Sequence, residues 1–347
     1  MRSSSRFFVP GILVAICAAG ISAQSPIPPK TVTLSKPSAT LADVLVEVGR
    51  QTGMSVEAVG VDGQTPCPVT LYDSPLWVAL DKVAEKTGTR VGLAKQGRTI
   101  QLTRYSGPQI AAASDGPFRV FVKQVQCKTD FETGKSFTEV TLDVHWEPRF
   151  PVFRIDGQPT ITAVAADAGA VPTATTSRAK TPPAGFQYTT TIRLEGIPRA
   201  ATKLTKLAGS FTVTASARML PFVFDIPAAG TTTKKEQDGV TVTLKPFKKV
   251  DDKWEAELDL HYPKQPEFES FESWVTENRA RLVAPDKAKK FTPVDDEVIQ
   301  RGTGVIAIYR FQSPPPVAGK GWTLEYDTPA PLVEFPIRFE LKDIPLP

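Results

Sequence analysis

Two short stretches of the chain share one alternation of apolar and polar residues. LDVHWEP begins at Leu142 and LDLHYPK begins at Leu258, and together they contain the only two histidines in the sequence. Successive side chains of a β-strand point to opposite faces, so the leucine and aromatic positions of each stretch should face a core. The pattern therefore predicts two copies of one strand. Each copy has an aspartate and a histidine on its polar face: Asp143, His145, Asp259 and His261.

The same period of two fills most of the chain after residue 117. The segments 117–227 and 239–347 are similar in length and match at both ends, since LPFVFDIP closes the first and FPIRFELKDIP lies near the end of the second. Proline and glycine interrupt the runs about every 8 to 12 residues, as in β-sandwiches. The sequence predicts two tandem β-sandwich domains, the second a duplicate of the first. Linkers rich in small and turn-forming residues are expected at 104–117 and 228–239.

A different period precedes these segments. Two runs, one starting at Leu41 and one at Leu76, repeat the i, i+3, i+4, i+7 spacing of one helical face. Thr40 followed by Asp43 forms a capping box before the first run, and each run ends at a Thr-Gly pair, where glycine can close a helix. Short β-prone runs flank both helices. These runs predict a small α+β domain over 31–103, with both helices on one face of a sheet.

The order of these runs carries a resemblance. TLADVLVEVGRQTGMSV, then PVTLYDSPLWVALDKVAEKTGTRV, then TIQLT resembles the short N-terminal domain of secretins and TonB-dependent receptors. The resemblance covers 31–103, about a fifth of the chain, and it implies a non-catalytic domain outside the inner membrane that binds partner proteins. No plug, barrel or pore segment follows Thr103, so a transport role is not implied. A generic ferredoxin-like sheet domain remains the alternative.

The start of the chain has the features of an export signal. Arg2 and Arg6 precede an apolar run at 7–20, which is too short for a comfortable membrane span. We therefore expect a signal peptide over 1–23 and a periplasmic or envelope-associated mature chain. The isoleucine before Cys17 argues against a lipoprotein signal. An uncleaved N-terminal anchor is the alternative.

Charge and cysteine content narrow the classes of partner. Removal of Arg2 and Arg6 lowers the formal net charge from +4 to +2, which is too little to indicate nucleic-acid binding. No later run is apolar enough to span a membrane. Two cysteines remain, Cys67 and Cys127, and an exported chain could hold them either as a disulfide or as two separate thiols.

The motifs of common enzyme and cofactor classes are absent from the sequence. Each Asp-x-His pair offers one imidazole and one carboxylate, whereas a zinc site needs three or four protein ligands. Gly134–Ser136 reads GKS but lacks the first glycine of a phosphate-binding loop, and no G-x-S-x-G elbow or H-E-x-x-H run is present. The sequence predicts no catalytic residue, cofactor or metal. The two Asp-x-His faces are either solvated or contact another protein.

Three functions agree with this pattern. The first is a non-catalytic envelope protein that acts as an interaction or scaffold module and binds envelope proteins through 31–103. The second is a protein that binds carbohydrate or another envelope polymer through exposed tryptophans such as Trp254, Trp274 and Trp322. The third is an enzyme of unrecognised type that uses carboxylates of VDDKWEAELD or FESFESW.

Overall fold

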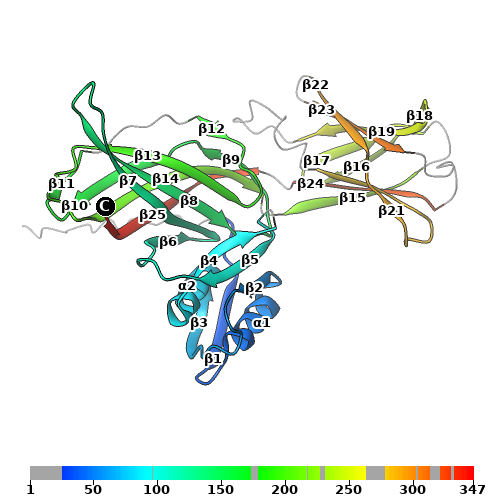
Figure 1. The fold of residues 1–347 in the computed structure, drawn as a ribbon. Coiled ribbons are helices and arrows are strands. Elements are labelled where there is room, and N and C mark those ends of the chain that lie inside the picture. Colours follow the sequence, from blue (N-terminus) through cyan, green and yellow to red (C-terminus); the bar gives the residue numbers. More distant parts are fainter. Residues whose placement is uncertain are drawn as a thin grey trace, which may run out of the picture.

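The computed structural model describes most of the chain after residue 25 (Figure 1). Strands make up 60% and helices 9%, which confirms a β-rich fold. The predicted signal peptide, 1–23, and Trp274 lie outside the described residues. The structure describes 26–95, 97–172, 179–216, 218–226, 231–262, 278–301, 304–312, 321–329 and 332–347.

Residues 31–104 form the helical unit of the molecule. Its elements are β1 (Thr31–Lys36), α1 (Leu41–Thr52), β2 (Ser55–Val59), β3 (Val69–Pro75), α2 (Leu76–Thr87), β4 (Thr89–Ala94) and β5 (Thr99–Arg104). Thr40 and Asp43 exchange the two hydrogen bonds of the predicted capping box, at 3.1 and 3.2 Å. Gly53 and Gly88 end the helices at φ values of 73° and 62°. The start of α1 and the ends of both helices were therefore predicted correctly from local chemistry, whereas α2 begins after Pro75 without a side-chain cap.

The strands of this unit form two sheets, where one was expected. β1 pairs with β3, while β5 lies between a parallel β2 and an antiparallel β4. Each helix contacts strands of both sheets. The reason lies in the width of the buried helix surface, since α2 buries Trp77 next to Leu76 in addition to its predicted stripe. A helix with so wide an apolar surface needs cover on two sides.

The described strands between residue 112 and residue 216 form the first sandwich-like unit, together with the strand at 332–345. Its sheets are β13-β8-β7-β6 and β11-β10-β14-β9-β12, with β25 on the other side of β14. The bounds are β6 (Ala112–Asp115), β7 (Phe118–Thr129), β8 (Ser136–Trp146), β9 (Val152–Asp156), β10 (Thr160–Ala166), β11 (Gly169–Ala170), β12 (Lys180–Thr181), β13 (Gln187–Glu195), β14 (Lys203–Ser216) and β25 (Leu332–Pro345).

The second sandwich-like unit contains the strands between residue 219 and residue 329. Its sheets are β16-β17-β19-β23-β22, with β18 also paired to β19, and β15-β24-β20-β21. The bounds are β15 (Met219–Asp225), β16 (Thr233–Gln237), β17 (Val240–Leu244), β18 (Lys248–Val250), β19 (Lys253–His261), β20 (Arg279–Val283), β21 (Lys290–Phe291), β22 (Asp295–Arg301), β23 (Gly304–Gln312) and β24 (Thr323–Pro329).

The two units share a pattern of strand pairing. β8 lies between β7 and β13, and β19 lies between β17 and β23. The hairpins β6–β7 and β10–β11 have counterparts in β16–β17 and β20–β21. LDVHW and LDLHY therefore occupy equivalent places in two related sheets. The segments expected as linkers each contain a short strand, β6 in one and β16 in the other.

The last strand of each predicted repeat lies in the unit of the other repeat. β25 pairs with β14 of the first unit, and β15 pairs with β24 of the second. The sequence-based boundaries, 117–227 and 239–347, had assigned these two strands the other way round. β15 and β25 nevertheless occupy equivalent places. β25 lies beside β14, which follows β13 in the chain, and β15 lies beside β24, which follows β23. Residues 217–218 separate β14 from β15, and β15 pairs with β24 instead of turning back onto β14.

The ladder of β14 with β25 and the ladder of β15 with β24 share one register and are together called the ribbon. Lys203 pairs with Pro345 at one end, and Asp225 pairs with Thr323 at the other. The register is the same in both ladders, because two residues separate the ladders on each strand. β14 and β25 contribute to the hydrophobic cluster of the first sandwich-like unit, and β15 and β24 contribute to that of the second. Figure 1 shows the two strand pairs in different units.

Three hydrophobic clusters fill the described part of the chain, one in the helical unit and one in each sandwich-like unit. Two residues cross between them. Ile27, which precedes the helical unit, packs in the cluster of the first sandwich-like unit. Phe153 of β9 packs in the cluster of the second. The units are therefore joined by apolar contacts as well as by the chain.

Candidate functional site

The helical unit contacts the first sandwich-like unit along α2. The indole nitrogen of Trp77 donates a 2.8 Å hydrogen bond to the carbonyl of Pro117, and the Trp77 side chain is fully buried. The backbone N–H of Lys30 donates to a carboxylate oxygen of Glu147 at 2.8 Å. These bonds use groups that would otherwise need water, so they fix where α2 lies against β7 and β8.

His145 lies inside this junction. Its ring is 6.3 Å from the ring of Trp77 and 4.8 Å, edge to face, from the ring of Phe121. Only 3% of the residue is exposed. Burial, with the nearby charges of Arg119 and Lys123, lowers the pKa of His145 from 6.5 to about 3. The imidazole is therefore neutral at ordinary pH.

The expected solvent exposure of the first Asp-x-His face was wrong. Asp143 is also buried, accepts a 2.6 Å hydrogen bond from Thr189 and lies 3.2 Å from the ammonium group of Lys123. The alternation itself is correct, because Leu142 and Val144 fill the core on the opposite side of β8. The helical unit covers the polar face at the end of β8, so both faces are buried there.

In the second copy, His261 is exposed and Asp259 is half-buried. Among the residues that the structure describes, no helix contacts this sheet as the helical unit contacts β8. The two Asp-x-His pairs lie in different sheets, so the structure does not bring the four predicted residues together. Across the described residues, no group of three or more histidine, cysteine, aspartate or glutamate side chains could hold a metal ion.

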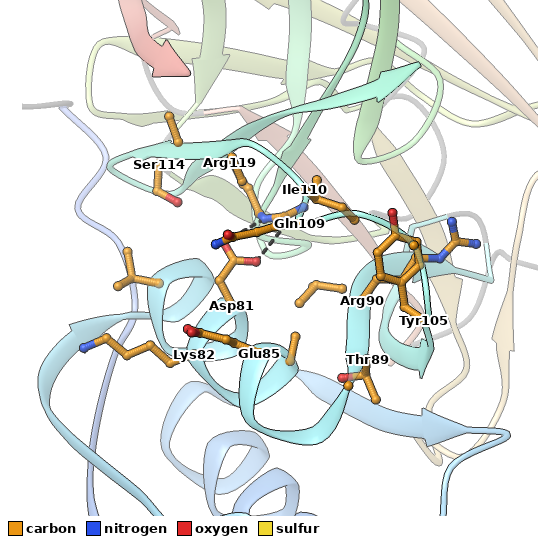
Figure 2. Close-up of a pocket in the computed structure, with 17 residues that line it drawn as sticks. Asp81, Lys82, Glu85, Thr89, Arg90, Tyr105, Gln109, Ile110, Ser114 and Arg119 are labelled. Carbon is orange, nitrogen blue, oxygen red and sulfur yellow. Dashed lines mark hydrogen bonds and ion pairs between the residues drawn. The ribbon is translucent and has the colours of Figure 1, made fainter. Parts of the chain in front are cut away.

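A groove of about 600 Å³ runs beside the junction (Figure 2). One wall is the surface of α2 with Asp81, Lys82 and Glu85. The second is the start of β4, where four consecutive residues, 88–91, line the space. The segment before and within β6, including Gln109, closes the opposite side. The groove is thus built from two units and the segment that connects them.

Arg119 of β7 is one of the residues that line this groove. Its Nε donates to one carboxylate oxygen of Asp81 at 3.0 Å, and its Nη2 lies 2.8 Å from the other (Figure 2). The guanidinium carbon is 4.4 Å from the centre of the Phe121 ring. The Arg119 side chain is 3% exposed. The paired carboxylate and the aromatic face together hold the guanidinium in one orientation.

One donor of this guanidinium is left over. Nη1 of Arg119 is buried and has no hydrogen-bond partner in the structure. An unsatisfied buried donor costs about 1 to 3 kcal/mol, and more when it is charged. A group with an oxygen acceptor that entered the groove would remove that cost. Arg119 is one of the residues that line the groove, so a carbonyl or carboxylate that reached Nη1 would meet a guanidinium already held in one orientation.

Sequence reasoning missed Arg119 and Asp81, which lie 38 positions apart. A signal was present nonetheless. In the run that starts at Phe118, the expected polar face carries Phe121 beside Arg119. An aromatic residue on that face indicates that something covers it, but the alternation does not say what.

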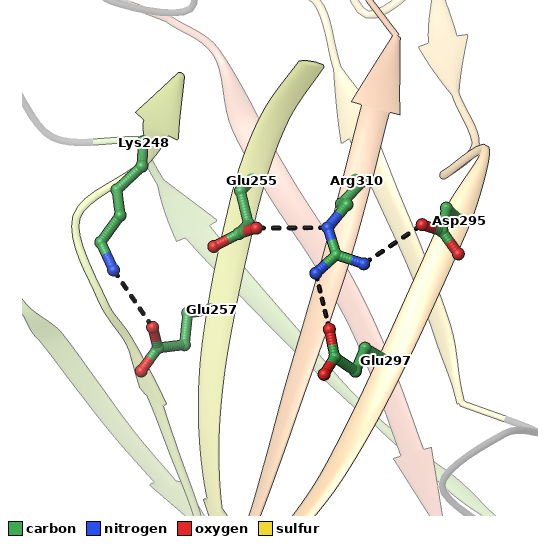
Figure 3. Close-up of polar contacts among 6 residues, drawn as sticks. All are labelled: Lys248, Glu255, Glu257, Asp295, Glu297 and Arg310. Atoms are coloured by element: carbon green, nitrogen blue, oxygen red, sulfur yellow. Dashed lines mark hydrogen bonds and ion pairs between the residues drawn. The ribbon is translucent and has the colours of Figure 1, made fainter. Parts of the chain in front are cut away.

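A second polar cluster lies on the sheet of β19, β22 and β23 (Figure 3). The guanidinium of Arg310 contacts carboxylates of Glu255 at 3.2 Å, Asp295 at 3.1 Å and Glu297 at 2.6 Å. Lys248 lies 3.4 Å from Glu257. Glu255 and Glu257 belong to VDDKWEAELD, where acids for sugar cleavage had been considered. Here each carboxylate faces a cation across neighbouring strands, as in cross-strand pairs that stabilise a sheet.

The tryptophans considered for sugar binding are not exposed platforms where the structure describes them. Trp322 is 8% exposed and packs 5.9 Å from Phe291. Trp254 is half-buried against the second sandwich-like cluster. The exposed aromatic residues among the described positions are Tyr72, on β3, and Phe131, in the β7–β8 connection. They belong to different units and do not form a common surface.

Cys67 and Cys127, the two cysteines within the described residues, form no disulfide. Cys67 is buried in the helical unit, where desolvation raises the pKa of its thiol, and Cys127 is exposed on β7. In the part of the chain that is described, no helix is long and apolar enough to cross a membrane. Comparisons with protein-family models, with curated proteins and with solved structures each found no match to this chain.

Proposed function

We propose that this chain is an exported cell-envelope protein that acts by binding another protein, with the groove beside α2 as its binding site. The observation that carries the proposal is the buried Arg119, whose Nη1 has no partner and which lines the groove. An interaction site explains such a donor, because a partner would supply the acceptor. The resemblance of 31–103 to the short N-terminal domain of secretins and TonB-dependent receptors supports the same role.

In this proposal the three clusters belong to three domains with different tasks. The α+β domain and the first β-sandwich form the binding site between them. The second β-sandwich is a spacer or a further surface, joined through the two-stranded ribbon. The apolar run at 7–20 supports export, with the mature chain beginning near Gln24.

The alternatives find less support. Polymer binding through aromatic platforms needs clustered exposed rings, whereas Tyr72 and Phe131 lie on separate units. An enzyme with two carboxylates needs one of them free to exchange a proton, whereas Glu255 and Glu257 both face cations. These contacts favour binding over catalysis.

Site-specific photo-crosslinking in the cells of origin tests this function. A crosslinking amino acid replaces Lys82 at the groove, and in a matched variant it replaces Lys135, which is exposed in the β7–β8 connection. We expect an envelope-fraction adduct of one discrete mass at position 82 and none at 135. Absence of an adduct at 82, or the same adduct at both positions, would refute the groove as the site that binds an envelope protein. Intact Met1–Gln24 on the envelope form would refute export by signal cleavage.

A further inference from the structure

The strand that borders the groove has an unpaired edge. β4 is the end strand of its sheet and pairs with β5 alone. Tyr105 donates its backbone N–H to the carbonyl of Gly88 at 3.0 Å, so the pair 88–105 is a hydrogen-bonded one. Such pairs alternate along an antiparallel ladder. The backbone groups of Thr89 and Val91 therefore point away from β5.

This edge lies along the groove. Residues 88–91 line it consecutively, whereas a strand that showed only one face would contribute alternate residues. The side chains of Thr89 and Val91 are buried. The groups of these residues that are available at the edge are therefore the backbone N–H and C=O. Exposed edges pair readily with an added extended segment.

The charged side chains around the groove set the charge of that segment. Lys82, Arg90 and Arg119 are cationic, while Asp81 and Glu85 are anionic. The lining therefore carries one net positive charge. A segment with one carboxylate balances it, and the free Nη1 of Arg119 can bond either to that carboxylate or to a backbone carbonyl of the segment.

We propose that the groove binds an extended peptide segment of a partner protein, which adds to the edge of β4 and carries one acidic side chain. This inference rests on the proposed function, since it names the chemistry of the partner. Strand addition supplies affinity through backbone hydrogen bonds, and Arg119 with the rim charges selects among sequences. The segment would lie between β4 and α2 on one side and the residues around Gln109 on the other (Figure 2).

The first test uses the full mature chain and a capped peptide, acetyl-Val-Thr-Asp-Thr-Val-amide, titrated by NMR. Two matched peptides carry N-methyl groups, one on its odd residues and one on its even residues. Only one edge of the bound peptide would pair with β4. N-methyl groups on that edge should abolish the chemical-shift changes of the Thr89 and Val91 amides, and N-methyl groups on the other edge should leave these changes in place. Retention or loss with both methylated peptides would refute strand addition.

The second test addresses charge. In a variant of the peptide, lysine replaces its aspartate, and we expect it to bind at least about fivefold more weakly. Lys82→Glu, at an exposed position, should weaken binding of the acidic peptide by a similar factor, while Lys135→Glu should leave its affinity unchanged. Arg119→Met should abolish binding, and the circular dichroism spectrum of each variant verifies its fold. Equal affinity of the two peptides, or no effect of Lys82→Glu, would overturn the charge assignment.

The two proposals fail separately. If crosslinking at position 82 captures an envelope protein but none of the peptides shifts the β4 amides, the interaction site stands and the extended acidic segment is wrong. If the peptide binds as described but position 82 gives no adduct, the groove binds peptides in solution and the envelope role is refuted.

Discussion

The indole of Trp77 packs 6.3 Å from the imidazole of His145, and this contact joins α2 to β8. The same indole donates its N–H to Pro117 at the start of β7. One side chain of the helical unit thus covers the polar face of a strand in another unit. The two histidines of the chain differ for this reason, although they occupy equivalent strands.

Replacement of the two histidines should separate their roles. His145→Ala should destabilise the protein by about 1 to 3 kcal/mol, because it opens space between Trp77 and Phe121. His261→Ala should stay within about 0.5 kcal/mol, as exposed substitutions do. Urea denaturation of both variants at pH 7 measures the difference. A loss within about 0.5 kcal/mol for His145→Ala as well would show that the junction around His145 contributes little to stability.

The buried imidazole should also make stability depend on pH. The pKa of His145 is about 3 in the folded chain, against 6.5 for an unperturbed histidine. Between these values the unfolded chain binds a proton that the folded chain does not, so stability should fall as pH falls from about 6.5 towards 3.

Denaturation at pH 7 and at pH 4.5 measures this loss, and His145→Phe is the control, because it keeps an aromatic ring without the titration. The variant should lose less stability than the wild type over this interval. The contribution of other groups, such as Glu147, cancels in the comparison. An identical loss in both proteins would contradict the low pKa of His145.

The ion pair between the buried Arg119 and the half-buried Asp81 offers a third prediction. Asp81→Asn should cost about 3 kcal/mol, because it leaves the guanidinium charge buried without a counterion. Glu340→Gln, which removes a carboxylate from ion pairs with Lys206 and Lys342 at the surface, should cost at most about 1 kcal/mol. Thermal denaturation compares the two. Similar small costs would mean that water reaches Arg119.

The exchanged strands make a prediction that contradicts sequence order. Ile337→Ala near the C-terminus should remove hydrogen-exchange protection from the first sandwich-like unit, because Ile337 packs in that cluster. Phe222→Ala, only six residues after β14, should instead remove it from the second. Each change should cost about 2 to 5 kcal/mol. Loss of protection in the unit next to each residue in sequence would refute the ribbon.

The equivalence of β8 and β19 is tested on their cores. Leu142→Ala and Leu258→Ala should each cost about 2 to 5 kcal/mol, since both leucines are fully buried. Hydrogen exchange should place the first loss in one sandwich-like unit and the second in the other. A negligible cost for either would contradict its place in a core.

The sequence by itself determined the local structure. Thr40 and Asp43 fixed the start of α1, and the glycine at 53 its end, because caps depend only on neighbouring residues. The period of two likewise gave the correct core face of β8, with Leu142 and Val144 inside. It also predicted a repeat, since equivalent strands need similar side chains to fill equivalent cores.

The tertiary structure alone decided what covers each surface. Strand pairing uses backbone groups that every residue except proline carries, so the sequence of β25 could not show that its partner is β14. Alternation marks which face is polar but not whether another unit lies over it. The pattern therefore predicted the same surroundings for both histidines, whereas His145 is buried and His261 is exposed. Arg119 and Asp81 meet only because α2 docks against β7. Such contacts depend on positions distant in the chain, and no local pattern encodes them.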